Sequence, residues 1–218
     1  MTPEQFTQAY PRLYHMAEAA AWPSIQRHGL LSTSALLDLY GITGPERDRI
    51  ERTRRPEAVP ITHTDYGQLF INDQRPMTDE TLGPALVDMT PSEWYAHLNA
   101  RVFFWVGEAR LERLLNTYRE RDKIVLVLDT AKVLTRHTAQ TMLSPINSGF
   151  SLRYAQKRGR GTFLPLADYP FEQWVKKRGR ADAVAECTIL GGVPSVEEVL
   201  VEKRDAKPAR RGASSAVG

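Results

Sequence analysis

The stretch KIVLVLDT, at residues 123–130, constrains the fold of this chain more than any other segment. It has the length of a strand and contains five consecutive aliphatic residues, with no polar alternation. Such a pattern is typical of a strand that is covered on both faces. A second strongly apolar segment, Val102 to Val106, predicts another core strand. The chain therefore needs a sheet that is buried on both sides.

The rest of the pattern mixes helices with short strands. The first helix is predicted from Thr2 as N-cap, with Pro3 in its first turn and Gln5 at the capping-box position. A short strand over 12–16 precedes a helix that Gly29 is placed to end. Because regular βαβ alternation is missing, we expect the α+β class.

The composition favours one substantial domain. Of the 218 residues, 42% are hydrophobic and 25% are charged, which is typical of globular rather than disordered chains. We expect a single domain over residues 1–204, in which 42–91 form an elaboration of short helices and loops. Residues 205–218 predict a disordered tail. Residues 183–204 predict two strands joined by a Gly-Gly-Val-Pro turn.

Several classes of protein lack their signals here. The single cysteine, Cys187, excludes an intrachain disulfide, and the five histidines have no metal-ligand spacing, so no metal is expected. No glycine-rich phosphate loop and no serine-hydrolase elbow occurs. No apolar run approaches the roughly 18 residues that span a bilayer, and no signal peptide is recognised. We therefore expect a cytoplasmic location and no membrane partner.

Basic residues recur in three runs, at 52–55, 157–160 and 176–180. A basic patch along a cleft would attract phosphates. Solvated loops explain the same runs, and the formal net charge of +3 is too mild to establish a nucleic-acid partner.

The stretch LYHMAEAAAWPSIQRHGLLST, residues 13–33, carries a resemblance. A strand histidine followed by a helix of the form x-x-I-x-x-x-G-L resembles the opening of NAD-dependent ADP-ribosyltransferase folds. These include the DarT-type DNA ADP-ribosyltransferase toxins, PARP-like enzymes and tRNA 2′-phosphotransferases. The chain looks closer still to a family of uncharacterised bacterial domains related to that fold. The shared motifs, in order, are INDQRPM (71–77), LNARVFFWV (98–106), SPINSGF (144–150) and AECTILGGVP (185–194).

The resemblance covers about residues 10–203 and implies a split antiparallel sheet with flanking helices. It also implies that NAD is the substrate. Cleavage of the nicotinamide–ribose bond passes through an oxocarbenium-like state, as glycoside cleavage does, and a nearby carboxylate stabilises it. Glu186, on the late strand AVAECTIL, matches the family's catalytic glutamate. An exposed glutamate at a sheet edge is the alternative, although burying an unpaired carboxylate in an apolar strand is costly.

The resemblance also implies residues that hold NAD. His15 would hydrogen-bond the adenosine ribose or the nicotinamide amide, and a packed strand histidine is the alternative. Ser32 and Thr33 match the adenine side, although either would also serve as the N-cap of the next helix.

Two arginines match the positions that would hold the NAD pyrophosphate, since a guanidinium binds phosphate oxygens in pairs. Arg101 precedes the VFFW strand, and Arg75 lies in a loop that would fold over the cleft; each is otherwise a surface cation. Asn147 and Ser148 resemble a polar turn beside the ligand, which a plain hairpin turn also explains. Two further residues, Arg160 and Thr162, are assigned to binding of the molecule that accepts ADP-ribose.

The departures from the family narrow the expected function. The His-x-Thr of the DNA-targeting toxins is not reproduced after His15, and the Glu/Gln-x-Glu pair of arginine-modifying enzymes is absent before Glu186. We expect transfer of ADP-ribose to a macromolecule, with nucleic acid slightly favoured over protein. An NAD glycohydrolase toxin, or a non-catalytic domain that binds a nucleotide or partner, are the alternatives. A toxin role would add an antitoxin or immunity protein as a partner.

Overall fold

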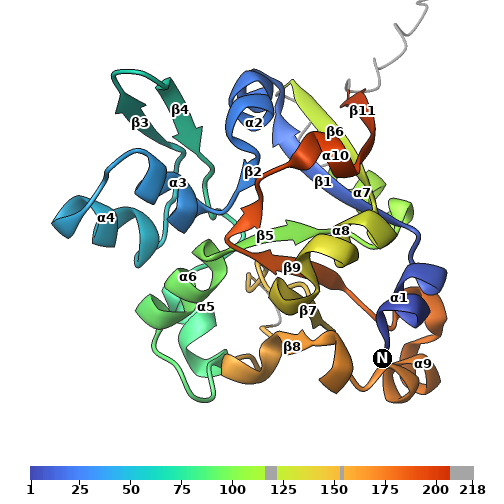
Figure 1. The fold of residues 1–218 in the computed structure, drawn as a ribbon. Coiled ribbons are helices and arrows are strands. Elements are labelled where there is room, and N and C mark those ends of the chain that lie inside the picture. The colour runs from blue at the N-terminus through green and yellow to red at the C-terminus, as the bar shows by residue number, and fades with distance from the viewer. Residues whose placement is uncertain (116–121, 153–154, 207–218) are drawn as a thin grey trace, which may run out of the picture.

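The computed structural model describes residues 1–115, 122–152 and 155–206. Its largest sheets are both antiparallel, and helices lie around them (Figure 1). The first sheet has the order β1 (Arg12–Glu18), β6 (Lys123–Asp129), β11 (Leu200–Ala206). The second has the order β5 (Arg101–Phe104), β9 (Glu186–Leu190), β7 (Thr141–Ser144), β8 (Leu164–Pro165). The predicted α+β class is confirmed.

The central strand β6 is covered on both faces, as its sequence predicts. Six of its seven residues are buried. Ile124, Leu126 and Leu128 belong to the main hydrophobic core. Val125 and Val127 point the other way and pack with Leu111 in a smaller cluster. The alternation follows from the two-residue period of a strand, and each buried aliphatic side chain stabilises the fold by about 1.5–3 kcal/mol.

The two sheets meet where β1 passes β5. The backbone N–H of Tyr14 donates to the carbonyl of Trp105 at 2.9 Å, and the N–H of Trp105 donates to the carbonyl of Tyr14 at 2.9 Å. This bridge brings His15 on β1 close to β5. Strand β1 also runs further than predicted, to Glu18, because it pairs with β6 along its whole length, as far as Lys123.

The N-terminal helices show the predicted caps. Helix α1 (Pro3–Ala9) begins with the full capping box between Thr2 and Gln5. Helix α2 (Trp22–His28) is shorter than predicted because the extended β1 and a 3₁₀ turn occupy its expected start. It ends at Gly29, whose φ of 84° and N–H bond to the carbonyl of Ile25 form the predicted C-terminal cap.

The other helices of the main body surround the sheets. They are α3 (Thr33–Leu39), α6 (Pro91–Asn99), α7 (Glu108–Leu115), α8 (Thr130–His137), α9 (Phe171–Arg178) and α10 (Val196–Val199). Helix α8 packs against β6, α1 and α10, and α7 contacts β1. Short 3₁₀ segments are Ala19–Ala21, Gly83–Ala85, Thr138–Gln140, Arg160–Thr162, Leu166–Asp168 and Arg180–Asp182.

The elaboration over 42–91 contains a hairpin that the sequence did not reveal. Besides α4 (Gly44–Glu51) and α5 (Asp79–Leu82), strands β3 (Val59–His63) and β4 (Gly67–Ile71) pair with each other. A separate hydrophobic cluster joins this hairpin to α3 and α4. In Figure 1 the hairpin projects beside α3, at the edge of the molecule.

The two strands predicted over 183–204 are present, but the prediction that a Gly-Gly-Val-Pro turn joins them is wrong. Strand β9 pairs in the second sheet and β11 in the first, and the glycines between them carry the chain across. Here β10 (Gly192–Val193) pairs with β2 (Leu30–Leu31). A Cβ on Gly192, at φ 124°, would lie 2.2 Å from the carbonyl oxygen of Leu30, so only glycine permits this approach.

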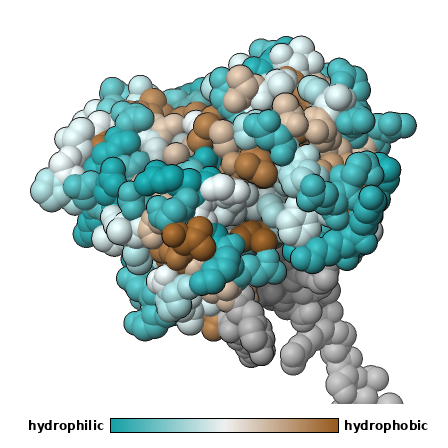
Figure 2. All heavy atoms as spheres, turned by 90° about the horizontal axis from the view of Figure 1, so that it is seen from below, coloured by the Kyte–Doolittle hydropathy of each residue, from teal (hydrophilic) through white to brown (hydrophobic). Residues whose placement is uncertain are grey.

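The C-terminal boundary is also corrected. Strand β11 includes Asp205 and Ala206, which were assigned to the tail, because both pair with β6. Residues 207–218 lie outside the described residues. No helix in the described ranges has the length and apolar character of a membrane span. Figure 2 shows one face of the molecule, where hydrophilic residues predominate and hydrophobic ones form small separate areas.

Candidate functional site

A cavity of about 600 Å³ lies beside the junction of the two sheets. One wall comes from β1, β5 and the start of β9, and the facing wall comes from β4 and residues 72–77. The β2–α3 connection and the 147–150 turn complete the lining. His15, Arg101 and Glu186, predicted from three separate motifs, all line this cavity.

Glu186 is the buried carboxylate of the cavity. Glu186 is 4% exposed. It occupies the first position of β9, where it pairs with Ser144 of β7. The backbone N–H of Ser148 donates to both carboxylate oxygens, at 3.2 and 3.1 Å. Burial raises the pKa of Glu186 to about 7, while hydrogen bonding to Ser148 and the charge of Arg158 oppose that rise. The carboxyl group can therefore take and release a proton near neutral pH.

His15, on β1, lines the wall of the cavity that the strands form. Its Nδ1–H donates to the carbonyl oxygen of Phe103 at 2.9 Å, and its ring contacts Phe104 at a centroid distance of 5.7 Å. Burial lowers the pKa of His15 below its ordinary value, only partly offset by the bond to Phe103. The imidazole is therefore neutral, with Nε2 as an acceptor for a hydroxyl or amide N–H.

Arg101 supplies a fixed positive charge at the same wall. Its guanidinium lies 4.6 Å from the centre of the Phe163 ring and donates to the carbonyl of His97. A longer contact of 3.7 Å joins it to the sulfur of Met142. Burial lowers the pKa of Arg101 to about 10, so it remains protonated at neutral pH. These partners are neutral, and none of His97, Met142 and Phe163 lines the cavity, although Arg101 itself does.

A second cation, Arg55, was not singled out by the sequence interpretation, which left its run as either a basic patch along a cleft or a solvated loop. The side chain is buried, lines the cavity, and donates to the carbonyl of Asn72 at 3.0 Å and to Oδ1 of Asn99 at 3.0 Å. It also donates to the carbonyl of Ile50. No charge pattern distinguishes Arg55 from its exposed neighbours, so only the fold identifies it.

The remaining polar residues around the cavity differ in what they contact. Ser32 is the N-cap of α3, accepting from the N–H of Ala35 at 3.2 Å, and it lines the cavity together with Thr33. Asn147 also lines the cavity, whereas Ser148 lies behind the surface and contacts Glu186 through its backbone. Lys123 and Glu18, which form an ion pair, also line the cavity.

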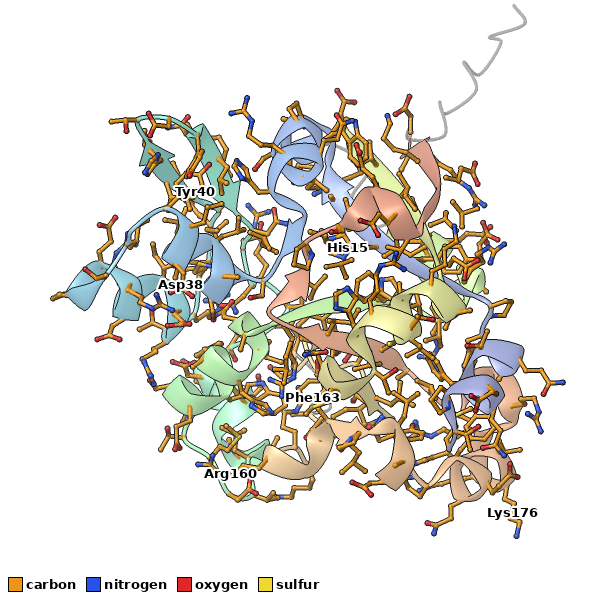
Figure 3. The ribbon with its side chains drawn as sticks, viewed as in Figure 1. His15, Asp38, Tyr40, Arg160, Phe163 and Lys176 are labelled. Atoms are coloured by element: carbon orange, nitrogen blue, oxygen red, sulfur yellow. The ribbon has the colours of Figure 1, made fainter. Side chains whose placement is uncertain are left out.

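Besides Ser148, three predicted residues lie outside the lining of this cavity. Arg75 is exposed and 3.6 Å from Asp73, at the edge of an adjoining cavity of about 550 Å³. Arg160 pairs with Glu93 at 2.9 Å, and the hydroxyl of Thr162 accepts from the N–H of Gly159 at 2.9 Å. In Figure 3, Arg160 lies near the lower edge of the molecule, far from His15. Their assigned roles in NAD and acceptor binding stay predictions.

The basic runs do not form one patch. Arg160 and Lys176 lie on opposite sides of the lower half of the molecule in Figure 3. In the two runs at 52–55 and 157–160, one arginine each, Arg55 and Arg158, is buried and bound to carbonyl oxygens. Among the described residues, no group of three or more His, Cys, Asp or Glu side chains is placed to hold a metal ion.

The site therefore joins a buried carboxylate, a neutral histidine and two cations around one cavity, a combination suited to a ligand with phosphates and a polarised bond. A comparison with curated proteins gives no match to this chain. A family described as a family of unknown function (DUF7002) matches residues 11–200, nearly the whole chain. The chain belongs to the DUF7002 family.

Proposed function

We propose that this chain cleaves the nicotinamide–ribose bond of NAD and transfers ADP-ribose to a macromolecular acceptor, within an ADP-ribosyltransferase fold. The observation that carries the proposal is the meeting of His15, Arg101 and Glu186 at one cavity. The volume of about 600 Å³ suits a dinucleotide, because small-molecule and cofactor sites measure roughly 300–1,000 Å³. The split arrangement of two antiparallel sheets supports the fold assignment.

Glu186 has the properties that this reaction needs. As the C1′–N bond breaks, its electron pair leaves with nicotinamide and positive charge develops on the ribose. An ionised carboxylate in a buried site stabilises that charge more strongly than one in water. An acceptor oxygen or nitrogen then bonds to C1′, and its proton passes to the carboxylate. A pKa of about 7 suits this exchange at neutral pH.

The other residues would bind NAD rather than react with it. Nε2 of His15 accepts from a ribose hydroxyl or from the nicotinamide amide. Arg55 and Arg101 would provide positive charge for the pyrophosphate; the Asp73 carboxylate, which lines the same cavity, acts electrostatically on Arg55. Ser32 and Thr33 line the same cavity and would contact the adenine side of NAD. The reaction requires NAD, so we place the protein in the cytoplasm.

The test is incubation of the purified chain with NAD labelled in its ADP-ribose half, with separate protein, DNA and RNA fractions. The matched variants are Glu186→Gln and Glu197→Gln, the second at an exposed site on α10. Label on a macromolecule in the wild type and in Glu197→Gln, but not in Glu186→Gln, supports the proposal. Free ADP-ribose with no labelled macromolecule would assign the chain as a glycohydrolase instead.

A toxin role has its own test. Expression that arrests growth only when Glu186 is intact would support it and would predict an antitoxin or immunity protein. If NAD is neither bound nor consumed at millimolar concentration, the proposal fails and the cavity belongs to another ligand.

A further inference from the structure

The turn over residues 147–150 fixes one side of the Glu186 carboxylate. Its Ser148 N–H reaches both carboxylate oxygens, and its flanking residues Asn147 and Gly149 line the cavity. A small movement of this turn would therefore change the direction of the carboxylate and the shape of the cavity beside it.

A buried arginine binds the same turn from behind. Arg158 is 2% exposed, and its Nη1 donates to the carbonyl of Ser148 at 2.8 Å. Its Nη2 donates to the carbonyl of Phe150 at 3.0 Å, and its Nε to the carbonyl of Gln156 at 2.9 Å. All three acceptors are neutral, so the electrostatic counterpart of this buried charge is the Glu186 carboxylate.

The backbone of Arg158 is itself held firmly by the elaboration. Its N–H donates to the carbonyl of Ala85 at 2.9 Å, and its carbonyl accepts from the N–H of Val87 at 3.0 Å. The next residue, Gly159, packs so closely that a Cβ there would lie 2.0 Å from Oδ1 of Asp88. The guanidinium therefore extends from a fixed point, which allows it to set the position of the turn.

We propose that Arg158 is a positioning residue, which holds the Ser148–Phe150 turn against Glu186 and supplies positive charge that favours the ionised carboxylate. The catalytic role of Arg158 rests on the proposed function, whereas its hydrogen bonds to the turn and its electrostatic effect on Glu186 can both be measured without NAD. The other charge that acts on Glu186 is Arg110 on α7, which is paired with Asp182 at 2.5 Å and is a smaller influence than Arg158.

Two substitutions of Arg158 separate the effect of its positive charge from the effect of its hydrogen bonds to the turn. Arg158→Gln removes the charge and keeps hydrogen-bond donors, while Arg158→Lys keeps the charge and loses the planar fork that spans two carbonyls. Lys157→Met is the matched control, because it removes the neighbouring cation, which donates to the carbonyl of Pro84 at the surface.

The charge is tested by ¹³C NMR titration of carboxyl-labelled glutamate, with the Glu186 signal assigned by its loss in Glu186→Gln. We expect Arg158→Gln to raise the Glu186 midpoint by about one pH unit, and Arg158→Lys and Lys157→Met to leave it near the wild-type value. A folded Arg158→Gln variant with the wild-type midpoint would overturn the electrostatic part.

The hold is tested by hydrogen exchange at the Ser148 amide, which we expect to be about tenfold faster in Arg158→Lys than in wild type or Lys157→Met. If Arg158→Gln does not fold, the milder variant Arg158→Lys still tests the positioning role. With NAD as substrate, the kcat of Arg158→Lys should fall about tenfold with KM little changed. Wild-type exchange and wild-type kcat in Arg158→Lys would refute the positioning role. Absence of NAD cleavage by the wild type would remove the proposed function and leave both NMR results standing.

Discussion

The two long walls of the cavity are built in different ways. The strand wall places His15, Arg101 and Glu186 on β1, β5 and β9, whose backbones are paired across the sheets. The facing wall, β4 and residues 72–77, is held to the main body by the side chain of Arg55, by the backbone hydrogen bond from Ser151 to Pro76, and by the burial of Ile71 and Met77 in separate clusters. The comparison teaches that the candidate reactive groups lie on paired strands, while the facing wall is held by a buried arginine and by local contacts of a loop.

The largest effect is expected on the strand wall, at Glu186. Glu186→Gln keeps the size of the side chain and an acceptor for Ser148 but removes the charge. We expect the rate of nicotinamide release to fall by about a thousandfold, because the developing positive charge loses its counterion. The measurement is single-turnover kinetics, alongside a thermal unfolding curve. An unchanged rate in a folded variant would remove Glu186 from the reaction.

The next effect concerns the facing wall. Arg55→Met would leave the carbonyl of Asn72 and the Oδ1 of Asn99 without their donor, at a cost of about 3 kcal/mol in the free energy of unfolding. We expect amide exchange to accelerate first in β4 and residues 72–77. Urea unfolding with mass-spectrometric hydrogen exchange measures both quantities. The exposed Arg49→Met is the control, and equal stability of the two variants would contradict the anchoring role.

A smaller effect is expected for His15. His15→Gln replaces the rigid imidazole with a flexible amide, so the acceptor is no longer held at the position of Nε2, and NAD binding should weaken by about tenfold, the value of roughly one hydrogen bond. Because burial lowers the pKa of His15, wild-type affinity should show no His15-dependent step near its ordinary pKa of about 6.5. Calorimetric titration across that range measures this. A step that disappears in His15→Gln would mean that the charged imidazole binds NAD.

The smallest effect is expected for Arg75, which lies on the facing wall but outside the main cavity. Its side chain is 62% exposed, and its ion pair with Asp73 is long. Arg75→Ala should change the free energy of unfolding by less than about 0.5 kcal/mol and the KM for NAD by less than about twofold. A tenfold rise in KM would instead show that the loop folds over the bound substrate.

The core behind the strand wall could be predicted from the sequence because its signals are local and periodic. The apolar run of β6 indicated a strand covered on both faces, and both clusters that pack on it are present. The caps at Thr2 and Gly29 were equally readable, since each depends on one or two neighbouring residues. Glu186 was chosen from the family resemblance, and the alternative of an exposed glutamate at a sheet edge is excluded by its burial.

The facing wall could not be predicted because its signals are long-range. Arg55 and Arg158 have the same sequence surroundings as exposed arginines, and only the tertiary fold buries them. The crossing at Gly192 resembles a hairpin turn locally, yet it carries the chain from one sheet to the other. Nothing in the sequence indicated that 59–71 would pair as a hairpin and lie opposite the strand wall.

One measurement tests the central claim most directly: the rate of nicotinamide release from NAD between about pH 5 and pH 9, for wild type and Glu186→Gln. The carboxylate must be ionised, so the wild-type rate should rise with pH, with a midpoint near the Glu186 pKa of about 7, and then level off. The variant should show a low rate without this rise. Equal rates in both proteins, or no release from millimolar NAD at any pH, would contradict the account.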